Sequence, residues 1–468
     1  MPLIAEPPAA VPPYHHPHKD QKVDLSEVAD LLSKHVTASL CEKVFQENRT
    51  VERQREWSFF ALSQFWIAVI IRAPEALTHA LSQVREGRDR IWPCVEATTE
   101  AFFQKAQNFS WKFFAALFNE LTPRFVREAH EVYADEMKDL RRHFPEIWVM
   151  DGSQLSEVAR RLKILRKVVG CVLPGRVFAF YDLFRGVCRH LQFEPDAARN
   201  ENLLATESLQ VVPEGTLLLG DRLFGVIKHF RHLSERKLWG VFRRNGTINI
   251  RVLKVLSRKQ GGGRSYLEDA LVEAGAGKDK VTLRLIRYSD GKRKLEVTTN
   301  VLDAKKLPAA TVIRLYALRW GIERMFFDLK EVLSLNHFYA GNLNAIAAQV
   351  YAGVIVYNAF RVMQGRLAQR HGIKPEELSP AKLYPRLAVA CGAMAQCELM
   401  WDQTLRANPG VTLRKPSYKN MSFASVRLES VLVEKKARPR TKGVPNPRST
   451  WLTWKKIPGG EKMLQELS

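Results

Sequence analysis

Apolar residues recur with a helical period over the first third of the chain. From Asp24 to Arg142 they fall every three to four positions, and proline or glycine separates the repeats, which predicts helices throughout. The most apolar run, Phe59 to Ile71, contains two polar residues and is too short to span a bilayer, so we expect a buried helix. The pattern predicts an all-α N-terminal domain over residues 24–142, after a flexible, proline-rich lead over residues 1–23.

Short apolar runs replace this period in the middle of the chain, and two of them stop at an aspartate. Ile147 to Met150 predicts a buried strand that ends at Asp151. Thr216 to Leu219 predicts a second strand, followed directly by Gly220 and Asp221. Both carboxylates are therefore candidates for a functional site.

A hairpin is predicted between these two strands. Its strands are expected at about Arg176 to Tyr181 and Val187 to Phe193. Asp182 is a weaker candidate for chemistry, because it begins the turn, where aspartate is favoured for local hydrogen bonding. A polar segment with helical character follows from Asp196 to Ser208.

Further strands predict a β-rich insertion at about residues 245–300, with runs at Ile248 to Leu256, Val281 to Tyr288 and Lys294 to Thr299. An amphipathic helix follows from Leu315 to Lys330, and another from about Asn344 to Gln369 is expected to pack behind it. The fold class is therefore α/β. We place this domain at residues 143–370 and a C-terminal region, helical and then a basic tail, at 371–468.

The charge balance favours a polyanionic partner. The 468 residues include 72 Lys and Arg against 49 Asp and Glu, for a net charge of +23, so nucleic acid is the leading candidate. Six cysteines occur without a C-x-x-C pair, which suits a reducing compartment and argues against a zinc finger. Because no signal pattern or spanning run appears, we expect cytoplasmic residence and no membrane partner.

Two stretches concentrate the positive charge. Residues 222–260 hold 11 Lys or Arg against one acid, which calls for an anionic neighbour. The candidate DNA contacts there are Arg222, Arg243, Arg244, Arg251 and Lys254. The tail from Glu434 to Lys456 is basic, rich in proline and interrupted by two tryptophans, which suits contact with phosphates and bases; a solvated tail is the alternative.

The helix from Leu315 to Lys330 carries an unusual polar stripe. At 100° per residue, Tyr316, Arg319, Glu323 and Lys330 fall within an arc of about 60° and extend over about 21 Å. Taken alone, Arg319 and Glu323 would indicate only a surface ion pair four residues apart, worth a few tenths of a kcal/mol.

The two aspartates upstream make a functional role of the stripe more credible than a surface ion pair. Asp151, Asp221 and Glu323 supply three carboxylates from separate elements of one α/β core. Because such groups repel one another, a fold would gather them mainly to hold divalent cations. Two Mg²⁺ ions about 3.5 to 4 Å apart can activate an attacking hydroxyl and stabilise the leaving oxygen of a phosphodiester. Tyr316, Arg319 and Lys330 would then hold DNA phosphates around the reacting bond.

The spacing Tyr316-x2-Arg319-x3-Glu323-x6-Lys330 resembles the Tyr-Arg-Glu-Lys signature of the insertion sequence four (IS-four) family of bacterial DDE transposases. The stretches MDGSQL around Asp151 and LLLGDRLFG around Asp221 resemble the two aspartate blocks of that family. The resemblance covers roughly residues 146–369, and three blocks in the same order make it specific.

The resemblance implies an RNase H-like core interrupted by a β-strand insertion, with Asp151, Asp221 and Glu323 as catalytic residues and ligands of two Mg²⁺ ions, for which Mn²⁺ can substitute. It also implies a homodimeric synaptic complex on double-stranded DNA, formed by the terminal inverted repeats and the target. The expected activity is cut-and-paste transposition by a bacterial, nucleoid-associated protein, with the N-terminal domain contributing DNA binding.

Three alternatives compete with this interpretation. A non-catalytic DNA-binding repressor derived from a transposase would keep the basic segments and need no acids. A glycosidase with two carboxylates would explain neither the basic stretch nor the Arg/Lys stripe. A phosphate loop is excluded at Gly275 to Lys280, because Val272 replaces the first glycine of that motif and Asp279 replaces the hydroxyl that would hold magnesium.

Overall fold

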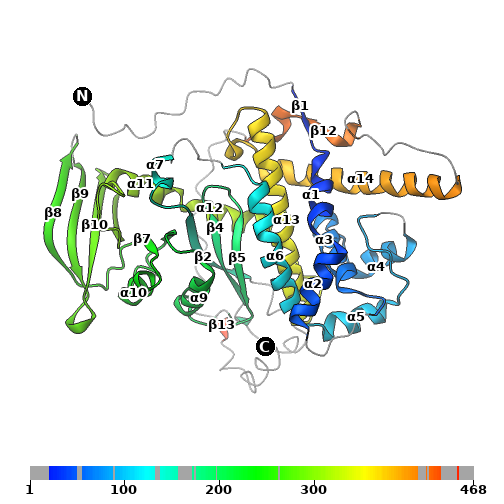
Figure 1. Ribbon diagram of the computed structural model, residues 1–468, viewed down its shortest axis with the longest axis horizontal. Coiled ribbons are helices and arrows are strands. Elements are labelled where there is room, and N and C mark those ends of the chain that lie inside the picture. The colour runs from blue at the N-terminus through cyan, green and yellow to red at the C-terminus, as the bar shows by residue number, and fades with distance from the viewer. Residues whose placement is uncertain are drawn as a thin grey trace.

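The computed structural model describes residues 21–49, 55–87, 90–131, 138–155, 171–172, 175–196, 198–261, 264–408, 418, 421–433 and 451–452. The first 20 residues of the predicted lead and most of the predicted basic tail lie outside these ranges. Within them, a mixed sheet occupies one half of an elongated molecule and a group of helices occupies the other (Figure 1).

The sheet has nine strands in the described part of the chain, in the order β5-β4-β2-β6-β7-β11-β10-β9-β8. Strand β6 runs parallel to both β2 and β7, and every other neighbouring pair is antiparallel. The strands are β2 (Ile147–Leu155), β4 (Gly175–Asp182), β5 (Cys188–Glu194), β6 (Leu217–Gly220), β7 (Trp239–Arg243), β8 (Ile250–Gln260), β9 (Ser265–Ala274), β10 (Val281–Asp290) and β11 (Lys294–Thr299).

Helices cover both faces of the inner strands. Ile147 and Val149 of β2 join one hydrophobic core, whereas Trp148 and Met150 join another, because successive side chains on a strand point to opposite faces. The second core is closed by α9 (Glu201–Ser208), the 3₁₀ turn η2 (Leu209–Val211) and α10 (Ile227–Glu235). The first is shared with the helical half of the molecule, so the two halves have one continuous core.

The helical half is built around α13 (Leu343–Arg370), which packs against α1, α3, α5 and α6. Its apolar composition and 28-residue length would suit a membrane span, but 94% of its apolar window is buried inside the protein, as expected of a core helix. The other helices of this half are α1 (Glu27–His35), α2 (Ala38–Asn48), α3 (Phe59–Arg72), α4 (Leu77–Glu86), α5 (Thr99–Asn108), α6 (Lys112–Glu128) and α14 (Pro380–Ala407). The short α7 (Lys138–Arg141) lies on the side of the sheet (Figure 1).

Short elements tie distant parts of the chain together. Strand β1 (Lys22–Asp24) pairs with β12 (Ser425–Arg427), and β3 (Cys171–Val172) pairs with β13 (Trp451–Leu452). The remaining short elements are the turns η3 (Gly277–Asp279), η5 (Pro375–Glu377), η6 (Ser422–Ala424) and η7 (Leu428–Val431).

Three local expectations need correction. Strand β2 does not stop at Asp151 but continues to Leu155, because β4 pairs with it along this whole length and supplies the ladder hydrogen bonds that the polar residues need. Strand β9 has no counterpart among the predicted strands, because acidic residues interrupt its apolar positions and weaken the strand pattern.

The third correction concerns the helix expected from Leu315 to Lys330. The chain forms α11 (Ala309–Leu318), α12 (Trp320–Phe327) and a π-helical turn, η4 (Asp328–Val332), in succession. Arg319 keeps helical dihedrals between α11 and α12, and the Leu333 N–H reaches back five residues to the Asp328 carbonyl at 2.9 Å. The segment is therefore helical throughout but not one regular α-helix.

Candidate active site

Asp151 and Asp221 lie on neighbouring parallel strands. Val149 of β2 stands opposite Leu219 of β6, so the same register continued by two residues brings Asp151 to the level of Asp221, directly beyond the end of β6. Neighbouring strands lie about 4.8 Å apart. The electrostatics agree with this proximity, because the charge of Asp221 is among the causes that raise the pKa of Asp151.

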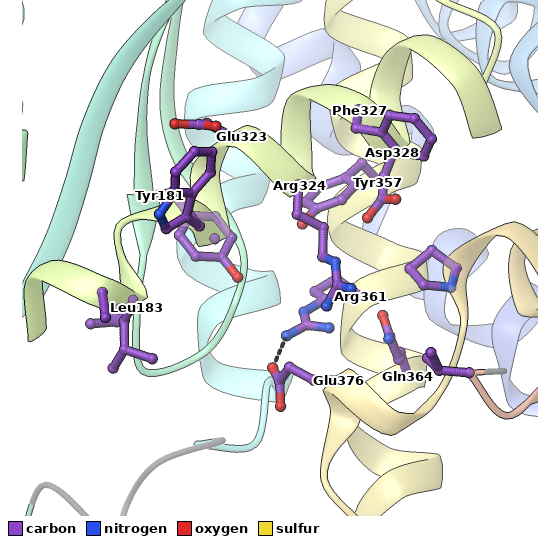
Figure 2. Close-up of a pocket in the computed structure, with 16 residues that line it drawn as sticks. Tyr181, Leu183, Glu323, Arg324, Phe327, Asp328, Tyr357, Arg361, Gln364 and Glu376 are labelled. Atoms are coloured by element: carbon purple, nitrogen blue, oxygen red, sulfur yellow. Dashed lines mark hydrogen bonds and ion pairs between the residues drawn. The ribbon is translucent and has the colours of Figure 1, made fainter. Parts of the chain in front are cut away.

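Helix α12 brings Glu323 to the same edge of the sheet. The helix packs against β2 and β4, and Gly321 allows the approach, since a Cβ at that position would lie only 2.8 Å from the ring of Tyr181. Figure 2 shows Tyr181 and Glu323 close together on these two elements. A larger residue at position 321 would push the helix away from the sheet.

Arg319 links the helix to the first aspartate. Its NH2 group lies 2.8 Å from the Glu323 Oε1 atom and its NH1 group lies 3.7 Å from the Asp151 Oδ2 atom. The guanidinium is also near the rings of Tyr316, at 5.8 Å, and Trp320, at 5.2 Å. Arg319 is only 9% exposed, so the ion pairs are largely shielded from water.

The other two residues of the stripe lie on either side of this bridge. Lys330 donates a hydrogen bond to Ser153 Oγ at 2.7 Å and so lies beside the far end of β2. Burial lowers the pKa of Lys330 and raises the pKa of Tyr316. The stripe predicted from the sequence therefore borders β2, although α11, α12 and η4 carry it in three pieces.

A fourth carboxylate, Glu201, approaches Asp151 from the other face of the sheet. A Cβ at Gly152 would lie 2.5 Å from the Glu201 Oε1 atom, so the glycine makes room for the acid. Arg176 holds Glu201, with its NH1 group 3.2 Å from Oε2. No motif in the sequence predicts this approach, because Glu201 has the pattern of an ordinary acid in the first turn of α9.

The surroundings favour a proton on Asp151. Burial, together with the charge of Glu201, raises the pKa of Asp151 to about 7, against the opposing effect of Arg319 and the Gly152 N–H. Asp182, by contrast, has a structural role: it is fully buried, its Oδ1 accepts hydrogen bonds from the Phe184 and Arg185 N–H groups, and Arg185 and Arg189 pair with its Oδ2.

The acids have the chemistry of a divalent-cation site but do not form one by themselves. Carboxylate oxygens are the ligands that Mg²⁺ prefers. However, among the residues that the structure describes, no group of three or more His, Cys, Asp or Glu side chains is placed to hold a metal ion. The guanidinium of Arg319 lies between two of the three predicted ligands.

The predicted DNA contacts differ in their surroundings. Arg222, Arg243 and Lys254 are exposed. Arg251 is exposed but pairs with Glu273 at 3.1 Å, and Arg244 pairs with Glu296 at 2.6 Å. Contacts with phosphates by these two arginines would therefore compete with ion pairs inside the insertion.

A cavity of about 650 Å³ lies between α12 and α13 and reaches Glu323 (Figure 2). Its lining includes Glu323, Arg324 and the buried Asp328, and Arg361 donates to Glu376 at 3.0 Å. Burial raises the pKa of Asp328 to about 7.

Comparison with known families agrees with this geometry. Residues 173–359 match the family model described as a transposase DDE domain, a stretch that contains Asp221 and Glu323 but begins after Asp151. Two curated relatives, both putative transposases, are also similar to part of the chain, and these matches support its resemblance to DDE transposases of insertion sequences. The resemblance inferred from the three motifs is therefore confirmed.

The first relative is a putative transposase, y4zB, of Sinorhizobium fredii, 25% identical over 38% of this chain and 53% of its own length. The second is a putative transposase for an insertion sequence element of Synechocystis, 24% identical over 35% of this chain and 46% of its own length. The chain spans about half the length of the curated relatives it matches. Among solved structures, a piggyBac transposase synaptic complex with hairpin DNA overlaps 86% of this chain and 88% of its own at 11% identity, with a TM-score of 0.38.

Proposed function

We propose that the chain cleaves the terminal inverted repeats of its insertion sequence and joins the freed ends to target DNA. One observation carries the proposal: strands β2 and β6 bring Asp151 and Asp221 side by side, and Arg319 connects the first of them to Glu323. The strand order β5-β4-β2-β6-β7, with the first three antiparallel and the last three parallel, supports the RNase H-like core that the motifs predict.

The three acids would hold divalent metal, Mg²⁺ or Mn²⁺, as a pair of ions. Bound there, the metal would lower the pKa of the attacking water or hydroxyl and stabilise the leaving oxygen. The chain's own cations do the rest. Lys330, beside β2, and Tyr316, next to Arg319, would hold phosphates beside the reacting bond. The exposed Arg222 and Arg243 would add further phosphate contacts.

Other parts of the proposal concern partners. We assign DNA binding to the helices of residues 24–142 and to the insertion strands, where Arg251 and Lys254 are exposed on β8. Cleavage at two ends of one element calls for two copies of the chain, so we propose a homodimer in the synaptic complex.

The decisive experiment changes Asp221 to Asn. The Asp221 Oδ1 atom accepts a hydrogen bond from the Leu223 N–H at 2.6 Å, and the asparagine oxygen can keep that bond, so only the charge is lost. We expect Mg²⁺-dependent cleavage of the element's own ends to be abolished while affinity for those ends remains. The ends are identified by sequencing the DNA that flanks the gene.

Asp290→Asn is the matched control, because its carboxylate also caps a local turn, accepting from the Lys292 and Arg293 N–H groups, but lies exposed in the insertion. It should cleave like the wild type. Unchanged cleavage by Asp221→Asn would refute the site. If the wild type binds the ends but never cleaves them, the chain acts as a DNA-binding repressor instead.

A further inference from the structure

The position of Arg319 conflicts with a shared cation at the proposed site. Its guanidinium contacts Glu323 at 2.8 Å and Asp151 at 3.7 Å, and these two acids come from different elements, α12 and β2. Magnesium binds its oxygen ligands at about 2.0 to 2.1 Å, so two carboxylates that share one ion approach each other to about 4 Å or less. A planar guanidinium and a metal ion cannot occupy the space between them together.

We propose that Arg319 is an internal counter-ion that occupies the place of the metal in the DNA-free chain, and that it must leave the two carboxylates before they can share a divalent cation. This inference rests on the proposed function, since it concerns the same acids. It adds a role for Arg319 that holding a phosphate would not by itself require.

The surroundings of Arg319 explain why it takes this position without DNA. The side chain is 11% exposed, and the nearby carboxylates of Asp221 and Glu201 both repel that of Asp151. Unneutralised acids in such a place would destabilise the fold, because burying unpaired charge is costly. One guanidinium that bridges the helix and the strand relieves part of that repulsion.

DNA offers Arg319 a competing partner. A phosphate accepts two parallel hydrogen bonds from a guanidinium, as a carboxylate does. Once a phosphate takes the guanidinium, Asp151 and Glu323 are left as two anions and attract a divalent cation. Metal binding and DNA binding are then positively coupled, and by linkage each ligand raises the affinity of the other.

This arrangement would restrain the enzyme when no DNA is bound. A protein that carries activated metal without its own ends in place would be able to cut DNA at random. An arginine across the site keeps metal binding weak until a phosphate takes the guanidinium.

The test measures Mn²⁺ affinity of the full chain without DNA, from the signal of unbound Mn²⁺ in electron paramagnetic resonance. Arg319→Gln should bind Mn²⁺ at least about tenfold more tightly than the wild type, because a positive charge in contact with the ligands has been removed. Arg324→Gln is the control: it removes the same charge from the same helical segment, but Arg324 lines the cavity between α12 and α13, where its charge acts on Asp328. Its affinity should match that of the wild type.

Two results would overturn the inference. One is equal or weaker Mn²⁺ binding by Arg319→Gln, which would show that the arginine assists the metal. The other is an equal gain in Arg324→Gln, which would show a general effect of charge. Should Arg319→Gln fail to fold, Arg319→Lys takes its place, since an ammonium cannot bridge both acids as a planar fork does; an affinity equal to that of the wild type would count against the proposal.

The outcome is separable from that of the proposed function. Asp221→Asn decides whether the acids support cleavage. If that variant loses cleavage and Arg319→Gln binds Mn²⁺ no better, the function stands and the counter-ion role fails. If no variant binds Mn²⁺, with or without a duplex of the element's ends, both proposals fail.

Discussion

The inner and outer strands of the sheet differ in burial and in the charges that they carry. The inner strands β5, β4, β2, β6 and β7 are covered by helices, and every residue of β4 is buried. The insertion strands β11, β10, β9 and β8 extend this sheet to an outermost strand, β8, of which all residues after Ile250 are exposed (Figure 1). The covered part gathers acids at one edge, and the uncovered part presents cations to solvent.

The difference shows how burial decides what a charge can do. Asp151 lies among buried groups, so its pKa is raised and its charge is balanced by Arg319. Lys254 lies on exposed β8, where water screens it and long-range attraction to a polyanion is its main effect. A shielded acid suits chemistry at one bond, whereas exposed cations suit a contact that reads only the phosphate backbone.

The join between the two parts gives the strongest test of the comparison. Arg284 of β10 is fully buried, pairs with Asp269 of β9, and donates from NH1 to the carbonyls of Val301 and Leu307, each at 3.0 Å. It thus fastens the insertion to the segment that leads into α11. Arg284→Met should lower the free energy of unfolding by about 3 to 5 kcal/mol, because Asp269 is left buried without its partner.

Urea denaturation measures this loss. Arg287→Met is the control. Arg287 lies on the same strand as Arg284 and pairs with Glu268 of β9 and Glu296 of β11, but its side chain is 28% exposed, so the substitution should cost much less. An unchanged free energy of unfolding in Arg284→Met would mean that the insertion and the segment before α11 are not joined through this residue.

A second test uses pH on the covered side. Burial raises the pKa of Asp328 to about 7 from its ordinary 3.8, so the folded chain holds a proton that the unfolded chain releases. Relative to an ionised carboxyl, Asp328 therefore adds most to the free energy of unfolding below about pH 4. That stabilisation is lost as pH rises toward 7. Asp328→Asn, which has no proton to lose, should gain stability relative to the wild type between pH 5 and pH 8, by a few kcal/mol at most at about 1.4 kcal/mol per pKa unit.

The measurement is urea denaturation of both chains at the two pH values. Asp290→Asn, which changes an exposed acid of the insertion, should keep a constant difference from the wild type over that range. A constant difference for Asp328→Asn as well would mean that its carboxyl is ionised in the folded chain.

A third test addresses the uncovered side. Arg251→Glu combined with Lys254→Glu should weaken binding of duplex DNA and reduce the dependence of log affinity on log salt by about one for each phosphate that is no longer neutralised. Fluorescence anisotropy over a series of salt concentrations gives both quantities. The same charge change at Arg386 and Arg406, exposed on α14, is the control and should leave the salt dependence nearly unaltered. Equal effects at the two places would mean that only net charge matters.

The smallest effect is expected from a leucine-to-serine substitution on exposed β8, compared with the same substitution on buried β6. Leu253 of β8 is 45% exposed, so Leu253→Ser should change the free energy of unfolding by no more than about 0.5 kcal/mol. Leu219→Ser, at a fully buried position of β6, should be strongly destabilising. If Leu253→Ser also destabilised the protein clearly, β8 would have a covering that the isolated chain lacks.

Sequence alone was enough to predict the family and the elements that carry the acids. The apolar runs before Asp151 and Asp221 predicted β2 and β6, and the spacing from Tyr316 to Lys330 predicted a helical segment with its stripe beside the core. Such predictions succeed because strand and helix periods are local, and because motif spacing along one element is set by its geometry.

Which groups meet at the site depends on the packing of the whole chain. The register of β2 against β6 sets Asp151 beside Asp221, Gly152 admits Glu201 from the opposite face, and Arg319 lies across the acids. Most of these approaches have no local signal, since they join residues tens to hundreds of positions apart. The balance of charge at the site is a property of packing, because burial makes each acid depend on whichever cation the fold brings within reach.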